Sequence, residues 1–100
     1  AGAPEVLSVF GDEIFINVGS ENGVHRGYRF AVFPGVRAEQ ENLDTTVKVA
    51  VIEVQDIIGA RVSKVKSVLG SGIEVGDRLE LILVPQGEGG PLNGEGGEGQ

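Results

Sequence analysis

The stretch Gly-Ile-Glu-Val-Gly-Asp-Arg-Leu-Glu-Leu-Ile, residues 72–82, repeats the pattern of an earlier stretch of this chain. That earlier stretch is Gly-Val-His-Arg-Gly-Tyr-Arg-Phe-Ala-Val-Phe, residues 23–33, and it begins 49 positions before the second (23 to 72). Each copy holds two glycines four positions apart, an arginine two positions further on, and apolar residues at matching places. A repeat of this kind predicts a small domain built from two related halves. The glycines predict structural corners of the chain: Gly23, Gly27, Gly72 and Gly76.

Around this repeat the sequence reads as short strands separated by turns. Runs of β-branched and aromatic residues, bounded by Gly, Pro and Asn, predict strands at residues 6–10, 14–18, 28–33, 47–54, 60–69 and 77–84. In the last of these, Leu79, Leu81 and Leu83 fall on one face at the strand period of two. In 47–54 the apolar face changes between Val51 and Ile52, which predicts either a β-bulge or a strand that turns a barrel corner. Residues 37–45 are polar and acidic, and predict the longest internal loop.

The fold class that follows is all-β. About six short strands with glycine turns predict a small closed barrel or a sandwich. The repeat favours the barrel, because two related halves can close on each other about a pseudo-twofold axis. Closure would also remove the exposed edges of so valine-rich a sheet. We assign residues 1–84 to the barrel domain. Residues 85–100 hold seven glycines and three glutamates, which predicts a flexible acidic tail.

Composition excludes several classes of function. The chain has 15 acidic and 8 basic residues, for a net charge of −7, and no basic stripe, so we expect no nucleic-acid partner. It has no cysteine, which excludes disulfides and thiolate chemistry. No apolar run approaches the roughly 20 residues of a membrane-spanning helix, so we expect no membrane insertion.

Residues 75–81, Val-Gly-Asp-Arg-Leu-Glu-Leu, resemble the GD box of cradle-loop barrels. The resemblance implies that Asp77 ties the corner at Gly76 to a neighbouring strand. The matching corner at Gly27 departs from this pattern, because Tyr28 replaces the aspartate. Residues 6–33 are similar to the C-terminal β-barrel of bacterial flagellar assembly protein T and to other small envelope-associated barrels. This wider resemblance implies an interaction module and not an enzyme.

The chemical motifs of the chain are weak. His25 is the only histidine, and no spacing joins it to a serine as a catalytic base. Asp12 and Glu13 lie on a predicted hairpin tip, where adjacent carboxylates point apart. The glycine-rich residues 70–76 lead into a strand and not into a helix N-terminus, so they lack the mechanism of a phosphate-binding loop. We therefore expect no catalytic, metal-binding or cofactor-binding residues.

The sequence thus predicts a non-enzymatic structural or assembly protein. We expect it to dock on protein subunits of a larger assembly, either a virus capsid that it decorates or a bacterial surface or flagellar machine, with a homo-oligomer as a further possibility. A virion or the bacterial envelope is favoured over the cytoplasm. The alternative is a small-ligand or carbohydrate-binding barrel that uses the open end near residues 37–45. The candidate partner contacts lie in the acidic loop and the tail: Arg37, Glu39, Glu41, Asp44, Pro91 and Leu92.

Overall fold

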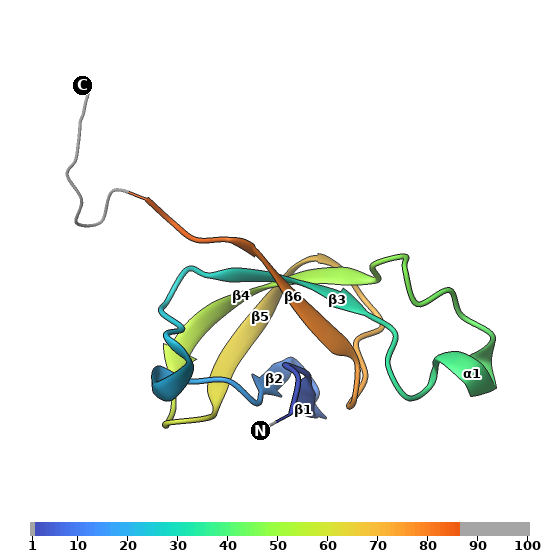
Figure 1. Ribbon diagram of the computed structural model, residues 1–100, viewed down its shortest axis with the longest axis horizontal. Helices are drawn as coiled ribbons and strands as arrows, with labels where there is room; N and C mark the ends of the chain where they lie inside the picture. Colours follow the sequence, from blue (N-terminus) through green and yellow to red (C-terminus); the bar gives the residue numbers. More distant parts are fainter. Residues whose placement is uncertain (1, 87–100) are drawn as a thin grey trace.

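The computed structural model describes residues 2–86, and the tail beyond Gln86, with Pro91 and Leu92, lies outside the described residues. Six antiparallel strands form one strongly curled sheet with almost no helix (Figure 1). The strands are β1 (Val6–Phe10), β2 (Glu13–Ile16), β3 (Arg29–Phe33), β4 (Ala50–Ile57), β5 (Ser63–Gly70) and β6 (Arg78–Leu83). Their order in the sheet is β1-β2-β5-β4-β3-β6. The prediction of an all-β chain with six strands is confirmed.

Strand β4 carries the predicted bulge. Its register with β5 shifts between Val51 and Ile52, which is where the apolar face of the sequence changes. The strand begins later than predicted, at Ala50, because Val47 belongs to the preceding turn and donates its N–H to the Asp44 carbonyl at 3.2 Å. The bulge lets Val51, Ile52 and Val54 all be buried, so a central strand follows the curl of the sheet.

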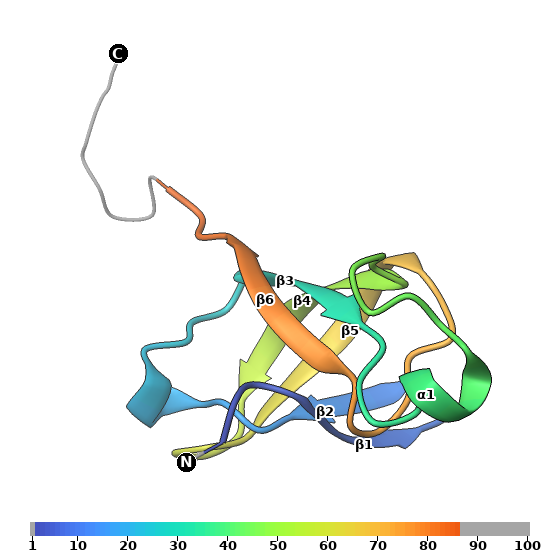
Figure 2. The same ribbon diagram turned by 45° about the vertical axis from the view of Figure 1, so that its right-hand side comes forward.

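The expectation of an irregular loop over residues 37–45 is wrong for four of its residues. Helix α1 (Ala38–Glu41) lies there, and Asn42 ends it in the left-handed conformation with φ 56°. The Ala38 N–H donates to the Gly35 carbonyl at 2.9 Å, and Ala38 is buried. Figures 1 and 2 show α1 at one end of the molecule, beside the end of β3. A second short helix, η1 (Ser20–Asn22), precedes β3.

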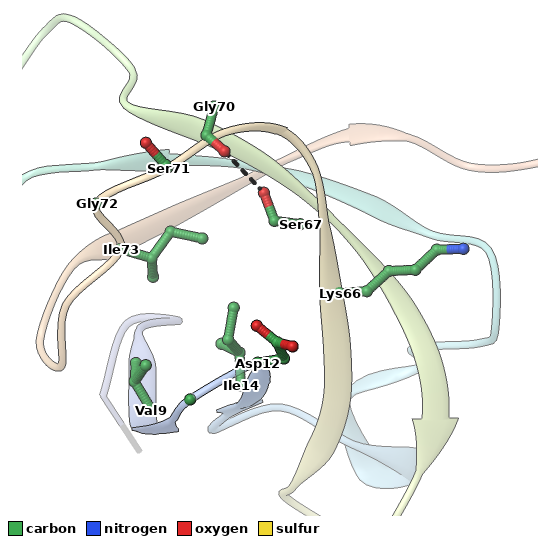
Figure 3. Close-up of a pocket in the computed structure, with 10 residues that line it drawn as sticks. Val9, Asp12, Ile14, Lys66, Ser67, Gly70, Ser71, Gly72 and Ile73 are labelled. Carbon is green, nitrogen blue, oxygen red and sulfur yellow. Dashed lines mark hydrogen bonds between the residues drawn. The ribbon is translucent and has the colours of Figure 1, made fainter.

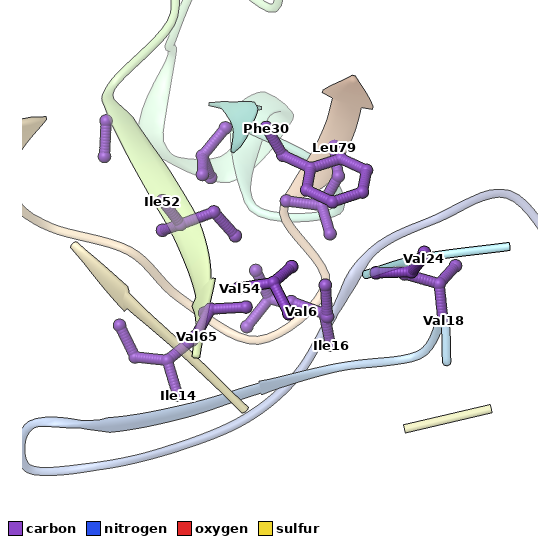
Figure 4. Close-up of a cluster of buried hydrophobic side chains, with 12 residues drawn as sticks. Val6, Ile14, Ile16, Val18, Val24, Phe30, Ile52, Val54, Val65 and Leu79 are labelled. Carbon is purple, nitrogen blue, oxygen red and sulfur yellow. The ribbon is translucent and has the colours of Figure 1, made fainter. Parts of the chain in front are cut away.

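The core fills the concave side of the sheet and is built almost entirely from valine and isoleucine (Figure 4). All six strands contribute buried residues, and Phe30 of β3 and Leu79 of β6 are the largest contributors besides the isoleucines. The cluster comprises Val6, Ile14, Ile16, Val18, Val24, Phe30, Val32, Ala50, Ile52, Val54, Val65 and Leu79. Because β-branched side chains have few rotamers, such a core orders at a low cost in side-chain entropy.

The outer strands β1 and β6 meet at one end only. Val6 accepts a hydrogen bond from the Gly76 N–H and donates one to the Asp77 carbonyl, both at 2.9 Å. The Leu79 N–H then donates to the Pro4 carbonyl at 3.1 Å. Beyond Leu79, no backbone group among residues 2–86 other than those of β3 is hydrogen-bonded to β6. The closing contact between the first and last strands is therefore short.

Two cross-strand pairs have the spacing of the sequence repeat. Phe15 of β2 lies opposite Lys64 of β5, and Ala31 of β3 lies opposite Glu80 of β6. Each of these pairs is separated by 49 positions (15 to 64 and 31 to 80). Strands β3 and β6, which carry the two repeated stretches, are thus paired with each other at equivalent residues.

Candidate interaction site

Strand β6 carries a run of exposed apolar residues along the edge of the sheet. Leu79 is buried in the core, but the four residues from Leu81 to Val84 are between 40% and 51% exposed. Leu79, Leu81 and Leu83 follow the predicted alternation, yet only Leu79 is covered. Leu81 to Val84 therefore form the candidate interaction site, which we call the β6 edge.

The β6 edge is exposed because the N-terminal segment turns away from it. Asn17 holds that segment through three hydrogen bonds: its amide N–H donates to the Glu5 carbonyl, its Oδ1 accepts from the Glu5 N–H, and its Nδ2 donates to the Ala3 carbonyl. These bonds hold Ala3 and Glu5 beside Asn17, which directly follows β2. In Figure 2 the N-terminus and the far end of β6 lie on opposite sides of the molecule.

A shallow depression adjoins the end of the β6 edge. It has a volume of about 250 Å³ and is lined by His25, Arg26, Tyr28, Val84 and Pro85. The rings of His25 and Tyr28 lie 5.6 Å apart at an interplanar angle of 56°. Apolar and aromatic surface next to the outer edge of a strand could receive a side chain of a bound segment.

The four predicted corner glycines all have positive φ: Gly23 75°, Gly27 88°, Gly72 80° and Gly76 90°. Two of them are covered by residues that follow the strands of the opposite half. A Cβ on Gly76 would lie 2.9 Å from Val36 Cγ2, and a Cβ on Gly27 would lie 3.0 Å from Pro85 Cγ. Val36 and Pro85 are themselves 49 positions apart.

Asp77 is the organising residue of the second corner. Its carboxylate is fully buried and accepts the Gly35 N–H at Oδ1 (3.3 Å) and the Glu74 N–H at Oδ2 (3.0 Å). Arg37 Nε donates to Oδ1 at 3.0 Å and Arg37 Nη2 to Oδ2 at 2.9 Å. The carboxylate thus joins its own corner to the segment that follows β3.

Arg37 has its partners inside the chain. Its side chain is 12% exposed, and besides Asp77 it contacts the Gly72 carbonyl at 2.8 Å and the Glu74 carboxylate at 3.3 Å. The hydrogen bonding that Arg37 donates to the Asp77 carboxylate is the main cause that raises the pKa of Arg37 above its ordinary value, against the effect of burial. Arg37 therefore acts in the fold, and little of it is open to a partner.

The acidic candidates of the same segment are exposed. Glu39 and Glu41 lie on α1, and Glu41 contacts Arg37 at 3.4 Å. Asp44 Oδ1 accepts the Thr46 hydroxyl at 2.6 Å and the Thr46 N–H at 2.8 Å, and these bonds lower the pKa of Asp44. A depression of about 520 Å³ lies beside α1, lined by residues that include Gly35, Val36, Ala38, Asn42 and Leu43.

A third depression lies between the β1–β2 turn and the connection from β5 to β6 (Figure 3). Its volume is about 390 Å³, and Ile14 and Ile73 contribute apolar surface. The Ser67 hydroxyl is turned to the Gly70 carbonyl at 3.1 Å, and Lys66 extends away from the other labelled side chains. A catalytic site requires polar groups that converge on a common point, and the polar groups of this depression do not.

Within residues 2–86 there is no group of three His, Asp or Glu side chains that could hold a metal ion. Nor does the described part of the chain contain a helix long and apolar enough to cross a membrane. Sequence comparison finds no family model that matches the chain and no curated protein similar enough to count as a relative.

Proposed function

We propose that this chain is a non-enzymatic interaction module that docks on protein subunits of a larger assembly. The observation that carries the proposal is the β6 edge, where Leu81 to Leu83 of β6 and the adjoining Val84 are exposed together, and where only β3 pairs with this part of the strand among residues 2–86. Soluble proteins protect exposed edges with charges, prolines or covering segments, because an unprotected edge pairs with other chains. An unprotected apolar edge in a stable fold supports a docking role.

The finer architecture that we propose is a small barrel with a pseudo-twofold axis, closed where β1 meets the corner at Gly76 and open along Leu81 to Val84. The pairs Phe15–Lys64 and Ala31–Glu80 support it, because a twofold axis through both pairs would exchange residues 49 positions apart. The bonds between Val6 and the corner at Gly76 supply the closing contact on the side of β1.

The hydrogen bonds of the two corners support the same symmetry. The Gly27 N–H donates to the Val54 carbonyl at 3.0 Å, and the Gly76 N–H donates to the Val6 carbonyl at 2.9 Å. Val54 and Val6 each return a bond to the residue that follows the glycine. Val6 and Val54 thus play matching parts on β1 and β4. The two halves differ in one respect: Asp77 of the second corner binds Arg37, whereas the first corner has Tyr28 at the position of Asp77.

We propose a virus capsid or a bacterial surface or flagellar machine as the context, with the virion or envelope as the location. Size-exclusion chromatography with light scattering, on a tagged protein in extract of its native cells, tests the proposal. The protein should elute with a partner or as a multimer, and truncation after Val84 should weaken that association. A monomer without partner, unchanged by the truncation, would contradict it.

The alternative of a small-ligand-binding barrel has a location in the depression beside α1. A thermal-shift measurement against metabolites and sugars distinguishes the two functions. Ligand binding would raise the melting temperature in proportion to the logarithm of ligand concentration above the Kd. The interaction module predicts a flat response, and a rise with ligand concentration that Leu43→Asp abolishes would replace it.

A further inference from the structure

We propose that the outer edge of β6, from Leu81 to Val84, binds an extended segment of a partner protein as an added antiparallel strand, and that this segment is apolar with a basic N-terminal flank. The inference rests on the proposed docking function and specifies its partner and its geometry. Strand addition takes its affinity from main-chain hydrogen bonds and its specificity from alternate side chains.

Alternate backbone N–H groups of β6 point away from β3. The Leu79 N–H points outward from β6, since it donates to the Pro4 carbonyl on the side of β1. The strand period of two places the Leu81 N–H on the same outward side. Leu81 also lies opposite Phe30 two residues along the ladder from the Leu79–Val32 pair. Its N–H is therefore directed to the position that an added strand would occupy.

The chain itself contains an example of such a covered edge. Residues Ala50 to Glu53 of β4 pair antiparallel with β3, and the Val49 N–H donates to the Val32 carbonyl at 2.8 Å. Strand β3 is the equivalent of β6 in the sequence repeat, so β4 indicates what the uncovered part of β6 would accept. The covering segment reads Lys-Val-Ala-Val-Ile over residues 48–52, which is a β-branched strand behind a lysine.

Charge favours a partner protein over a second copy of this chain. Each copy carries a net charge of −7, and three glutamates but no basic residue occur in the sequence that follows Leu83. Two copies paired through β6 would bring like charges together, whereas a segment with basic residues would be attracted. An added antiparallel strand would start near Val84, where the charge of Arg26 is already paired with Asp56, and the sequence beyond Val84 adds only acidic charge.

The other outer strand, β1, is a weaker candidate. Val6 is already bonded to Gly76 and Asp77, and Val9 lies in the depression that Ile73 also lines. The connection from β5 to β6 thus lies beside β1. Among residues 2–86, no backbone group outside β3 is hydrogen-bonded to Leu81–Leu83, and Val84 at the end of the β6 edge adjoins His25 and Tyr28.

The test uses the whole chain and the peptide acetyl-Lys-Lys-Val-Ala-Val-Ile-Thr-Val-amide, titrated at low salt and followed by amide NMR and hydrogen exchange. We expect resonances of residues 80–84 to shift saturably, and the Leu81 amide to exchange at least about tenfold more slowly in the complex. A peptide with two glutamates in place of the lysines should bind more weakly. A peptide with proline in place of its second valine should not bind.

Two variants separate backbone pairing from side-chain contact. Leu81→Pro removes the outward N–H at an edge position that tolerates proline, and should abolish binding. Leu81→Ala keeps the N–H and should retain most of it. If Leu81→Pro does not fold, which the remaining amide spectrum reports, Ile82→Lys replaces it and should also abolish binding.

Several outcomes would overturn the inference: no saturable shift at residues 80–84, shifts confined to β1, or equal binding by Leu81→Pro. Protection of Leu81 that grows with protein concentration alone, with a doubled mass, would assign the edge to a second copy. If the native extract shows a partner but the peptide leaves β6 unchanged, strand addition is wrong and the docking function stands. If neither experiment shows association, both are wrong.

Discussion

Arg37 closes on the buried carboxylate of Asp77 through two parallel hydrogen bonds of 3.0 and 2.9 Å, although the residues lie 40 positions apart. This bidentate pair joins the segment after β3 to the corner before β6. Planar pairing of guanidinium and carboxylate is among the stronger polar contacts in proteins. The pair holds α1 against the sheet, since α1 begins at the residue after Arg37.

Arg37→Ala should strongly destabilise the fold. It leaves the Asp77 carboxylate buried without its counter-charge, so we expect the free energy of unfolding to fall by about 2–4 kcal/mol. Urea denaturation followed by circular dichroism measures this loss. Arg26→Ala is the matched control, because Arg26 pairs with Asp56 on the exposed surface and should cost less than about 1 kcal/mol. Equal losses in the two variants would refute a structural role for the buried pair.

Gly35→Ala should be more costly than a substitution at a corner glycine in open space. A Cβ on Gly35 would collide with the Gly76 carbonyl oxygen and lie 3.1 Å from Asp77 Cα, both backbone atoms. We expect a loss of about 2–4 kcal/mol of unfolding free energy. Gly72→Ala meets no atom within 4 Å and costs only its positive φ, about 1–2 kcal/mol. The reverse order of the two melting temperatures would show that this close approach is absent in solution.

Ser63→Ala should stabilise the protein. The Ser63 hydroxyl is fully buried in β5 and has no hydrogen-bond partner among the described residues. Replacing it by a methyl group removes an unpaired polar group, so we expect the free energy of unfolding to rise by about 1 kcal/mol. Ser67→Ala provides the comparison, since the Ser67 hydroxyl bonds to the Gly70 carbonyl. A loss of stability in Ser63→Ala would mean that its hydroxyl is paired.

Thr46→Val should raise the pKa of Asp44. The Thr46 hydroxyl bond is the main cause that lowers this pKa, and the Thr46 N–H bond, which the variant keeps, adds to it. A carboxyl with a lowered folded-state pKa contributes stability above its ordinary pKa of 3.8, and this contribution is lost as pH falls through the lowered value. NMR titration of the Asp44 carboxyl carbon should therefore move to higher pH in Thr46→Val. An unchanged titration would show that the hydroxyl bond is not formed.

Much of the fold could be predicted because strand signals are local. The bounds of β1 follow from a run of β-branched and aromatic residues that ends at a glycine turn, and the bulge at Val51 and Ile52 follows from the change of the apolar face. Helix α1 could not be predicted in this way. Its four residues are too few to form a stable helix alone, and they are held by Arg37, whose partner Asp77 is far along the chain. The resemblance implied a tie from Asp77 to a neighbouring strand, but no local pattern indicated that Arg37 would be its partner.

The β6 edge was missed for a different reason. Alternation indicates which residues share a face, and Leu79, Leu81 and Leu83 do follow it. Whether that face is covered depends on the path of another segment. Here Asn17 holds Ala3 and Glu5 beside the end of β2. The N-terminal segment therefore reaches along β6 only as far as Leu79, whose N–H donates to the Pro4 carbonyl. The run of four apolar residues, Leu81 to Val84, at the end of the last predicted strand is the sequence signal that could have indicated the site.

Recovery of the native partner by two matched lysine variants tests docking through β6 most directly. Ile82→Lys places a charge on the β6 edge, whereas Leu69→Lys places one on β5, where Leu69 is 61% exposed. Both proteins, tagged and cross-linked in their native cells, are compared with the wild type by quantitative mass spectrometry. We predict that Ile82→Lys loses the partner that the wild type recovers and that Leu69→Lys retains it. Full recovery with Ile82→Lys, or equal loss with both variants, would contradict the account.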